Sequence, residues 1–341
     1  MKAGLPGLAL AISLSLLFCS CGGYADFTLP VPAASPTATT FTLNFEPNPV
    51  LAHGSTGEWD SHDALNPSVV RHAGLFYNFY SGFDGATWRT GLATSADGRN
   101  WQKAGTILAP DPATWEGSYI AANGSALFRG GEFLYWYQAG PRESPRLGLA
   151  RSPDGRRWTR LPAPVLPVGP RGSWDERGVA DPYVLYVRNA YYLFYLGQDR
   201  ARRQRLGVAR STDGVHWDKL RANPILELGG IGAFDENGLG EPAVWIGQGY
   251  YWMLYTGRDY QERRRLGLAR SRDGVSWQKL PAVFAGREPW NSQVLCDPSI
   301  EALGDKLAVW FGGGDVPSPD ENLHGQIGIG VLEPVGATLG R

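Results

Sequence analysis

A short hairpin motif recurs four times along the chain at nearly equal spacing. Its form is Ser-x-Asp-Gly-x-x-Trp, and consecutive tryptophans lie 57, 59 and 60 residues apart, at Trp101, Trp158, Trp217 and Trp277. An Asp-Gly pair favours a tight turn because glycine tolerates positive φ. A strand of the Gly-Leu-Ala-Arg-Ser type precedes each copy. The motif therefore predicts four β-hairpins in four equivalent units.

A second motif occurs five times. An aromatic residue followed by an acid or amide stands seven or eight positions before a polar residue that is itself followed by Pro or Gly. An apolar strand, a turn and an aromatic-rich strand come next. Each unit thus contains four strands in about 58 residues, which is typical of β-propeller blades. The five polar residues are Asn66, Asn123, Asp181, Glu241 and Asp297.

The fifth unit lacks the Asp-Gly-Trp hairpin and its last strand. The N-terminal segment 48–60 copies segment 223–235, so we expect a strand at roughly residues 41–52 to complete the blade formed by 297–332. That closure would remove the open sheet edges. We therefore predict an all-β, five-bladed β-propeller over residues 41–335, with four antiparallel strands per blade and an N-terminal strand closing the last blade.

The N-terminus has the features of an export signal. Lys2 precedes a short apolar run from Leu5 to Phe18, and Cys21 follows Ser20 as in the lipobox of bacterial lipoproteins. We predict a lipoprotein signal over 1–21 with lipidation at Cys21, a flexible tether over 22–40, and a lipid-anchored protein at the cell surface or in the periplasm. A plain secretory signal is the alternative. Cys296 would then have no disulfide partner.

The five polar residues begin the strands that line a propeller channel, so we expect them at one channel mouth. Because the chain alternates direction, the ends of the second strands return to the same mouth. Paired carboxylates there suit glycoside hydrolysis: one acid protonates the leaving oxygen, and a second carboxylate activates water or attacks. A third charge raises the pKa of the acid. Further candidates for substrate binding are His62, Asp84, Gln138, Asp199, Arg258, Asp259 and Asp315.

Less specific interpretations apply to the same residues. Polar residues at strand starts can accept backbone N–H groups or border a channel that holds water. The arginine-rich loops 198–205 and 258–265 are either solvated and paired with acids, or recognise an anionic group such as a uronate or phosphate. The chain has no His-x-x-x-His or similar metal spacing. We predict no cofactor, although the oxygen-rich ring is compatible with a structural Ca²⁺ in the channel.

The repeats, the Asp-Pro and Glu-Pro strand starts and the hairpins resemble the five-bladed glycosidases of families 32, 43, 62, 68 and 130. In family 43 the resemblance implies an Asp base in blade one, an Asp that tunes pKa in blade three and a Glu acid in blade four. Asp181 and Glu241 match the last two. Blade one departs from the family 43 pattern, because it carries the amide Asn66 in place of the Asp base. Asp63 or Asp297 would then be the base. The Asn-Pro start also resembles family 130 mannoside phosphorylases, in which phosphate replaces water.

These observations lead to a glycoside hydrolase acting on oligo- or polysaccharide. A phosphorylase and a carbohydrate-binding propeller without catalysis are the alternatives. The formal net charge of −1 gives no reason to expect a nucleic-acid partner. We expect a monomer that meets the membrane only through its lipid anchor. The sequence does not specify the sugar or the linkage.

Overall fold

The computed structural model describes residues 23–34, 38–303 and 306–336. The predicted signal segment and Cys21 lie outside the described residues. Within the described part, no helix is long and apolar enough to cross a bilayer.

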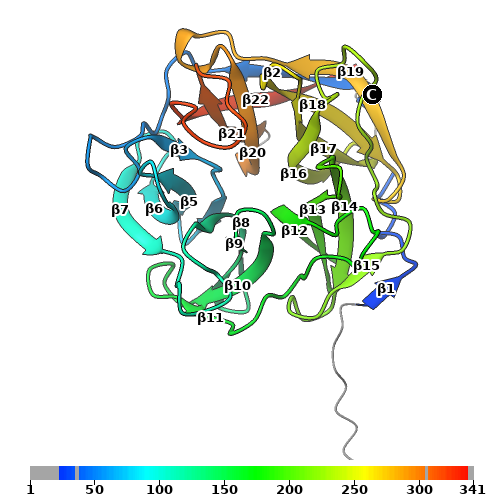
Figure 1. Cartoon of the computed structure of the whole chain (residues 1–341). Coiled ribbons are helices and arrows are strands. Elements are labelled where there is room, and N and C mark those ends of the chain that lie inside the picture. The colour runs from blue at the N-terminus through cyan, green and yellow to red at the C-terminus, as the bar shows by residue number, and fades with distance from the viewer. Residues whose placement is uncertain (1–22, 35–37, 304–305, 337–341) are drawn as a thin grey trace, which may run out of the picture.

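The described strands pair in five antiparallel groups that surround a central axis (Figure 1). Blade 1 contains β3 (Asp63–Leu65), β4 (Val69–His72), β5 (Leu75–Phe83), β6 (Trp88–Ser95) and β7 (Gln102–Leu108). Blade 2 contains β8 (Ile120–Arg129), β9 (Glu132–Gly140), β10 (Arg146–Ser152) and β11 (Thr159–Arg160). Blade 3 contains β12 (Gly178–Val187), β13 (Ala190–Gln198), β14 (Gln204–Ser211) and β15 (Asp218–Leu220).

The last two blades differ in how they end. Blade 4 contains β16 (Gly238–Gly247), β17 (Tyr250–Arg258), β18 (Arg264–Ser271) and β19 (Trp277–Phe284). A short 3₁₀ helix, η1 (Pro289–Asn291), leads into blade 5, which contains β20 (Val294–Leu303), β21 (Lys306–Gly314) and β22 (Gln326–Val335). The fourth strand of blade 5 is β2 (Thr40–Phe45), which pairs antiparallel with β22 from Thr40↔Val335 to Phe45↔Gly330. The predicted closure by an N-terminal strand is therefore confirmed, and Leu51 adds one further bridge to Ile327.

The Asp-Gly-Trp hairpins join neighbouring blades. In blade 3 the Ser211 hydroxyl accepts the Gly214 N–H, and the Gly214 carbonyl accepts the indole N–H of Trp217 at 3.1 Å. The same carbonyl accepts the indole N–H of Trp136 from blade 2 at 2.8 Å. Trp310 of blade 5 makes the equivalent bond to Gly98 of blade 1. The motif thus binds blade 3 to blade 2 and blade 1 to blade 5, on the side away from the inner-strand starts.

The predicted tether over 22–40 is wrong for its described residues. A strand absent from the prediction, β1 (Gly23–Ala25), pairs in parallel with β15 at the edge of blade 3 (Figure 1). Leu29 is buried, and its N–H donates to the Asp273 carbonyl in a blade 4 hairpin. The Tyr251 hydroxyl donates to the Pro30 carbonyl. This segment covers apolar surface at the junction of blades 3 and 4, which the proline- and threonine-rich composition did not indicate.

Candidate active site

The five ring residues share one unusual backbone conformation. Their φ angles lie between 47° and 52°, in the left-handed region that few residues other than glycine adopt. Inner strands β8, β12, β16 and β20 shift register at these residues, as in a β-bulge. In blade 1 the same irregularity separates β3 from β4. Strained backbone of this kind is often found at functional sites. The residues are Asn66, Asn123, Asp181, Glu241 and Asp297.

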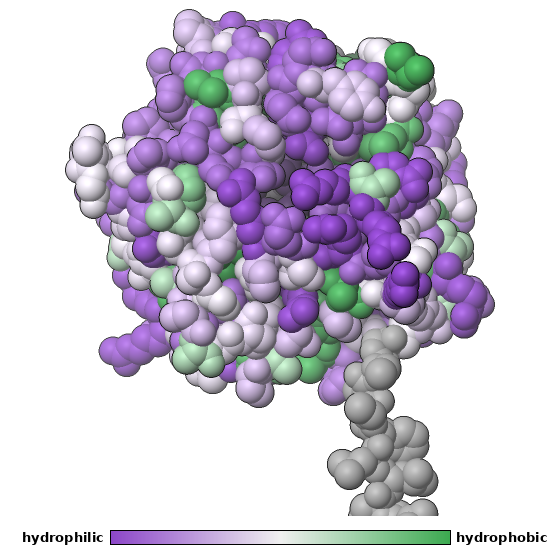
Figure 2. Space-filling model, viewed as in Figure 1, coloured by the Kyte–Doolittle hydropathy of each residue, from purple (hydrophilic) through white to green (hydrophobic). Residues whose placement is uncertain are grey.

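A cavity of about 230 Å³ opens where the inner strands begin. Figure 2 shows the corresponding hollow near the centre of the molecule, surrounded by strongly hydrophilic residues. The ends of the second strands and the starts of the third strands also contribute to its wall, as expected from the alternating chain direction. All five ring residues line it, as do Gln138, Arg258, Gln204 and Arg264.

The ring carboxylates accept hydrogen bonds from the main chain of the next blade. The Glu241 N–H donates to Asp181 at 3.2 Å, and the Asp297 N–H donates to Glu241 at 3.4 Å. The Asn66 N–H donates to Asp297 at 3.1 Å. The Asn123 amide donates to Asp181 at 2.6 Å and to Gln138 at 3.2 Å. These bonds hold the acids in place without neutralising their charge.

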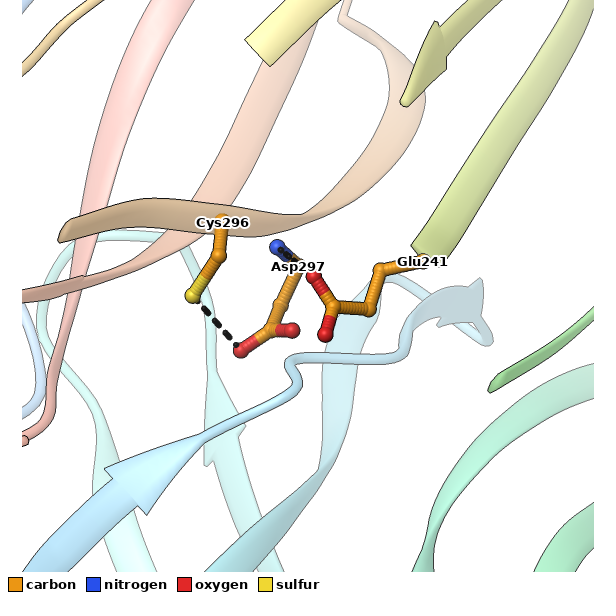
Figure 3. A group of neighbouring side chains, drawn as sticks. All are labelled: Glu241, Cys296 and Asp297. Carbon is orange, nitrogen blue, oxygen red and sulfur yellow. Dashed lines mark hydrogen bonds between the residues drawn. The ribbon is translucent and has the colours of Figure 1, made fainter. Parts of the chain in front are cut away.

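Glu241 and Asp297 form a close pair of acids (Figure 3). Figure 3 shows their carboxyl groups side by side, with the Cys296 thiol donating to Asp297 on its other side. Ligand atoms of the three residues lie within 4.8 Å of one another. Burial and the charge of Glu241 raise the pKa of Asp297 well above its usual value. Both effects favour the protonated form of Asp297, so this pair of acids is suited to sharing a proton.

Asp181 is the third acid of the site. Burial, followed by the charge of Glu241, raises the pKa of Asp181 to about 7. The Asn123 amide and the Glu241 N–H act in the opposite direction because they favour the charged carboxylate. Asp181 therefore exists in both protonation states near neutral pH, which suits proton transfer.

Arg264 is a site residue that the sequence interpretation did not single out. It is the first residue of β18, is buried, and lines the same cavity as the acids. Burial disfavours its charged form, but Glu241 and Asp297 raise its pKa through their charges. The arginine-rich loop was noticed in the sequence, yet nothing there distinguished Arg264 from its less buried neighbour Arg263. The start of a third strand was the available signal.

Asp63 was predicted as a candidate base, and the structure contradicts this. Its side chain is fully buried and does not line the cavity. Its carboxylate accepts three main-chain N–H groups, from Asn322 at 2.7 Å, Leu323 at 2.9 Å and Gly325 at 2.8 Å. Asp63 therefore fixes the loop that follows β21, and its oxygens are not available to a substrate.

Five of the predicted substrate-binding residues also lie outside the cavity. Asp199 and Asp259 are buried acids that accept the N–H and guanidinium groups of Arg203 and Arg263 within their own loops. Asp84 bonds the turn before β6 and pairs with Arg89. These contacts match the alternative that the loop charges are paired with one another. The residues outside the cavity are His62, Asp84, Asp199, Asp259 and Asp315; those inside are Asn66, Asn123, Gln138 and Arg258.

A metal centre has limited support among the described residues. Glu241, Cys296 and Asp297 are the group with suitable spacing. However, Arg264 already supplies positive charge beside Glu241 and Asp297. This charge disfavours a cation at this point. The absence of a cofactor stays a prediction.

Comparisons with known proteins agree with this architecture. Residues 67–228 match the family model described as glycosyl hydrolases family 32 N-terminal domain. A solved glycoside hydrolase shares 16% identity and a TM-score of 0.70, covering 87% of this chain and 95% of its own. An α-L-arabinofuranosidase from Podospora anserina has a TM-score of 0.67 at 15% identity, covering 88% of this chain and 99% of its own. The chain has the propeller fold of glycoside hydrolases.

Two relatives with detectable sequence similarity extend the comparison. An uncharacterized protein from Mycobacterium tuberculosis is 26% identical over 227 residues, which cover 62% of this chain and 75% of the relative. A 1,2-β-oligomannan phosphorylase from Thermoanaerobacter sp. is 26% identical over 195 residues, covering 50% of this chain and 64% of that enzyme. The predicted resemblance to propeller glycosidases and mannoside phosphorylases is therefore confirmed.

Proposed function

We propose that this propeller cleaves a glycosidic bond of an oligo- or polysaccharide in the cavity at its channel mouth. The observation that carries the proposal is a group of three acids, Asp181, Glu241 and Asp297, of which two have raised pKa values. Perturbed carboxyl groups in a cleft are typical of glycosidases, where one group donates and another accepts a proton. The N-terminal segment predicts that the reaction takes place outside the cytoplasm.

Glu241 is the general acid in this proposal. It is the least buried of the three acids and lies beside Asp297, whose proton it can share. In the reaction the Glu241 carboxyl gives its proton to the leaving oxygen as the glycosidic C–O bond breaks. Asp297 then returns a proton to Glu241 through their contact. Asp297 itself does not touch the substrate and acts by positioning Glu241.

Asp181 is the base in the hydrolytic form of the proposal. Burial and the charge of Glu241 raise the pKa of Asp297 and so favour its protonated form, which does not suit the role of base that the sequence suggested. Asp181 has a pKa of about 7 and faces the same cavity. It can therefore accept a proton from an attacking water while Glu241 supplies one to the leaving group.

The first test is Glu241→Gln, which keeps the size and an acceptor oxygen but removes the transferable proton. We expect a loss of kcat of about 10²–10⁴-fold on a cleaved glycan, the usual contribution of a general acid. Asp84→Asn, which changes an acid of the same face outside the cavity, should keep activity within about threefold because no substrate contact is lost. Equal activity of Glu241→Gln and wild type would overturn the proposal.

Phosphorolysis is the second candidate, and the similarity to the oligomannan phosphorylase favours it. Blade one also carries Asn66 instead of an acid, as the resemblance to that group implies. Cleavage that requires inorganic phosphate and releases a sugar phosphate would establish phosphorolysis. Cleavage in phosphate-free buffer would establish hydrolysis, and glycan binding without turnover would leave only the binding propeller.

A further inference from the structure

One guanidinium of the cavity wall has a buried donor without a partner. Arg264 is 8% exposed, and its Nη2 donates to the Pro319 carbonyl. Its Nη1 is buried and has no hydrogen-bond partner among the described residues. A buried charged donor left unpaired is costly, and the cost is removed when a ligand accepts from it. This points to a ligand group that approaches Arg264 from the cavity.

The other arginines of the cavity are already engaged. Arg258 donates to Glu262 at 2.9 Å and to Gln204 at 2.8 Å. Arg142 pairs with Asp320 at 3.0 Å and Glu321 at 2.9 Å, and the exposed Arg202 pairs with Glu143 at 3.6 Å. In contrast, no carboxylate in the described part of the chain is close enough to Arg264 to form an ion pair, although Glu241 and Asp297 influence it by charge. Arg264 is therefore the cation of this wall whose charge is left for a ligand.

We propose that Arg264 binds a carboxylate carried by the sugar, so that the substrate is an acidic glycan containing a uronic acid. This inference rests on the proposed glycosidase function and adds the class of its substrate. The guanidinium is planar and strongly prefers carboxylate or phosphate oxygens. One free cation matches the single charge of a carboxylate better than the nearly double charge of phosphate near neutral pH. Glu241 and Asp181 beside it would further repel a dianion.

The test compares pairs of sugars that differ only in the carboxylate at C6. The probes are D-glucuronate, D-galacturonate and D-mannuronate against glucose, galactose and mannose, with inorganic phosphate as a separate arm. Binding to the full folded chain is measured by ligand-observed NMR or calorimetry at low ionic strength. We expect at least one uronate to bind about tenfold or more tightly than its hexose, the usual effect of one charge-assisted hydrogen bond.

Variants of two neighbouring arginines show which side chain is responsible. Arg264→Gln should abolish the preference for the uronate, and Arg264→Lys should weaken it because the planar fork is lost. Arg263→Gln is the matched control: Arg263 pairs with Asp259 outside the cavity, so the preference should persist. A thermal unfolding curve for each variant verifies that it is folded. If Arg264→Gln does not fold, the wild-type comparison of uronate with hexose still tests whether the cavity prefers an acidic sugar.

Three outcomes would overturn the inference. They are equal binding of every uronate and its hexose, a uronate preference that survives in Arg264→Gln, and phosphate binding at Arg264 in place of all uronates. Because binding needs no turnover, this test is independent of the proposed reaction. A uronate preference with full activity in Glu241→Gln would reject only the catalytic proposal. No preference with an inactive Glu241→Gln would reject only the substrate class.

Discussion

The chain contains two sets of acids that the same repeat generates but that have different roles, an outer set and an inner set. The outer set precedes the inner strands and belongs to the aromatic-acid motif. In blade 3, Asp175 is fully buried, accepts the Tyr195 hydroxyl at 3.3 Å and pairs with Lys219 at 2.6 Å. Blades 1, 2 and 4 repeat this arrangement with Asp60, Glu116 and Asp235, each bonded to a tyrosine of the second strand and to a cation of the fourth strand.

The inner set lacks such cations. Among the described residues, Asp181, Glu241 and Asp297 form no ion pair, and their nearest partners are main-chain N–H groups, one amide and one thiol. Burial and mutual repulsion therefore raise the pKa of Asp181 and Asp297. The carboxylates of the outer set, which are bonded to a cation, stabilise the blades. Those of the inner set, which have no bonded cation, retain the capacity to exchange protons.

Blade 5 shows what happens when the cation is missing from the outer set. Its fourth strand is β2 from the N-terminus, so no lysine or arginine arrives from a hairpin strand. At the acid position the chain carries Asn291, which is neutral, and Phe311 packs with Trp290 nearby. A buried acid there would have had no counter-charge, which is costly. The exception supports the interpretation that pairing decides whether the outer position carries an acid.

The largest expected effect is on the stability of the outer set. Asp175→Asn would leave Lys219 buried and uncompensated, and burial already lowers the pKa of Lys219. We expect a loss of about 3–5 kcal/mol in the free energy of unfolding, measured by urea denaturation. Asp26→Asn, in an exposed pair with Arg221, is the control and should change stability by less than about 1 kcal/mol. Equal effects in the two variants would contradict the distinction between buried and exposed pairs.

The sequence was sufficient for the fold because the information was repeated. Five polar strand starts and four Asp-Gly-Trp hairpins each identify the same unit, so the closing strand and the ring at Asn66 to Asp297 followed. Features that occur only once in the chain were harder to predict. Asp63 stands three residues before Asn66 and was placed in the cavity by proximity, but whether a side chain points to the channel depends on the loop 322–325, far away in sequence.

Two further features depended on contacts that no repeat encodes. The segment 23–30 binds blades 3 and 4 through Leu29 and β1, which occur once in the chain. Arg264 gains its importance from burial beside Glu241 and Asp297, whereas its neighbour Arg263 is paired with Asp259. A run of three arginines cannot show which of them faces the cavity, because adjacent residues of a strand point to opposite sides.

A smaller effect tests Asp63 as an acid of the structural kind. In Asp63→Asn one carboxylate oxygen becomes an amide NH₂, which cannot accept the main-chain N–H that it faces. We expect a loss of about 1–3 kcal/mol in the free energy of unfolding, the cost of a buried donor without its partner. Activity should fall through a higher KM as the loop 322–325 loosens. An unchanged KM together with a changed pH optimum would instead return Asp63 to the catalytic group.

The smallest expected effect concerns how the stability of the inner set depends on pH. A carboxyl group whose pKa is higher in the folded state than in the unfolded state favours folding at low pH, and this stability is lost as the pH rises through the folded pKa. For Asp181 that window runs from about pH 4 to about pH 7.

Glu241→Gln removes the charge that raises the pKa of both Asp181 and Asp297. The melting temperature of this variant relative to wild type should therefore increase as the pH rises from 5 to 8, by a few degrees. Gln138→Asn, an uncharged change in the same cavity, should show no such trend. A parallel pH profile for wild type and Glu241→Gln would mean that the inner acids do not repel one another, and the contrast with the outer set would then rest on position alone.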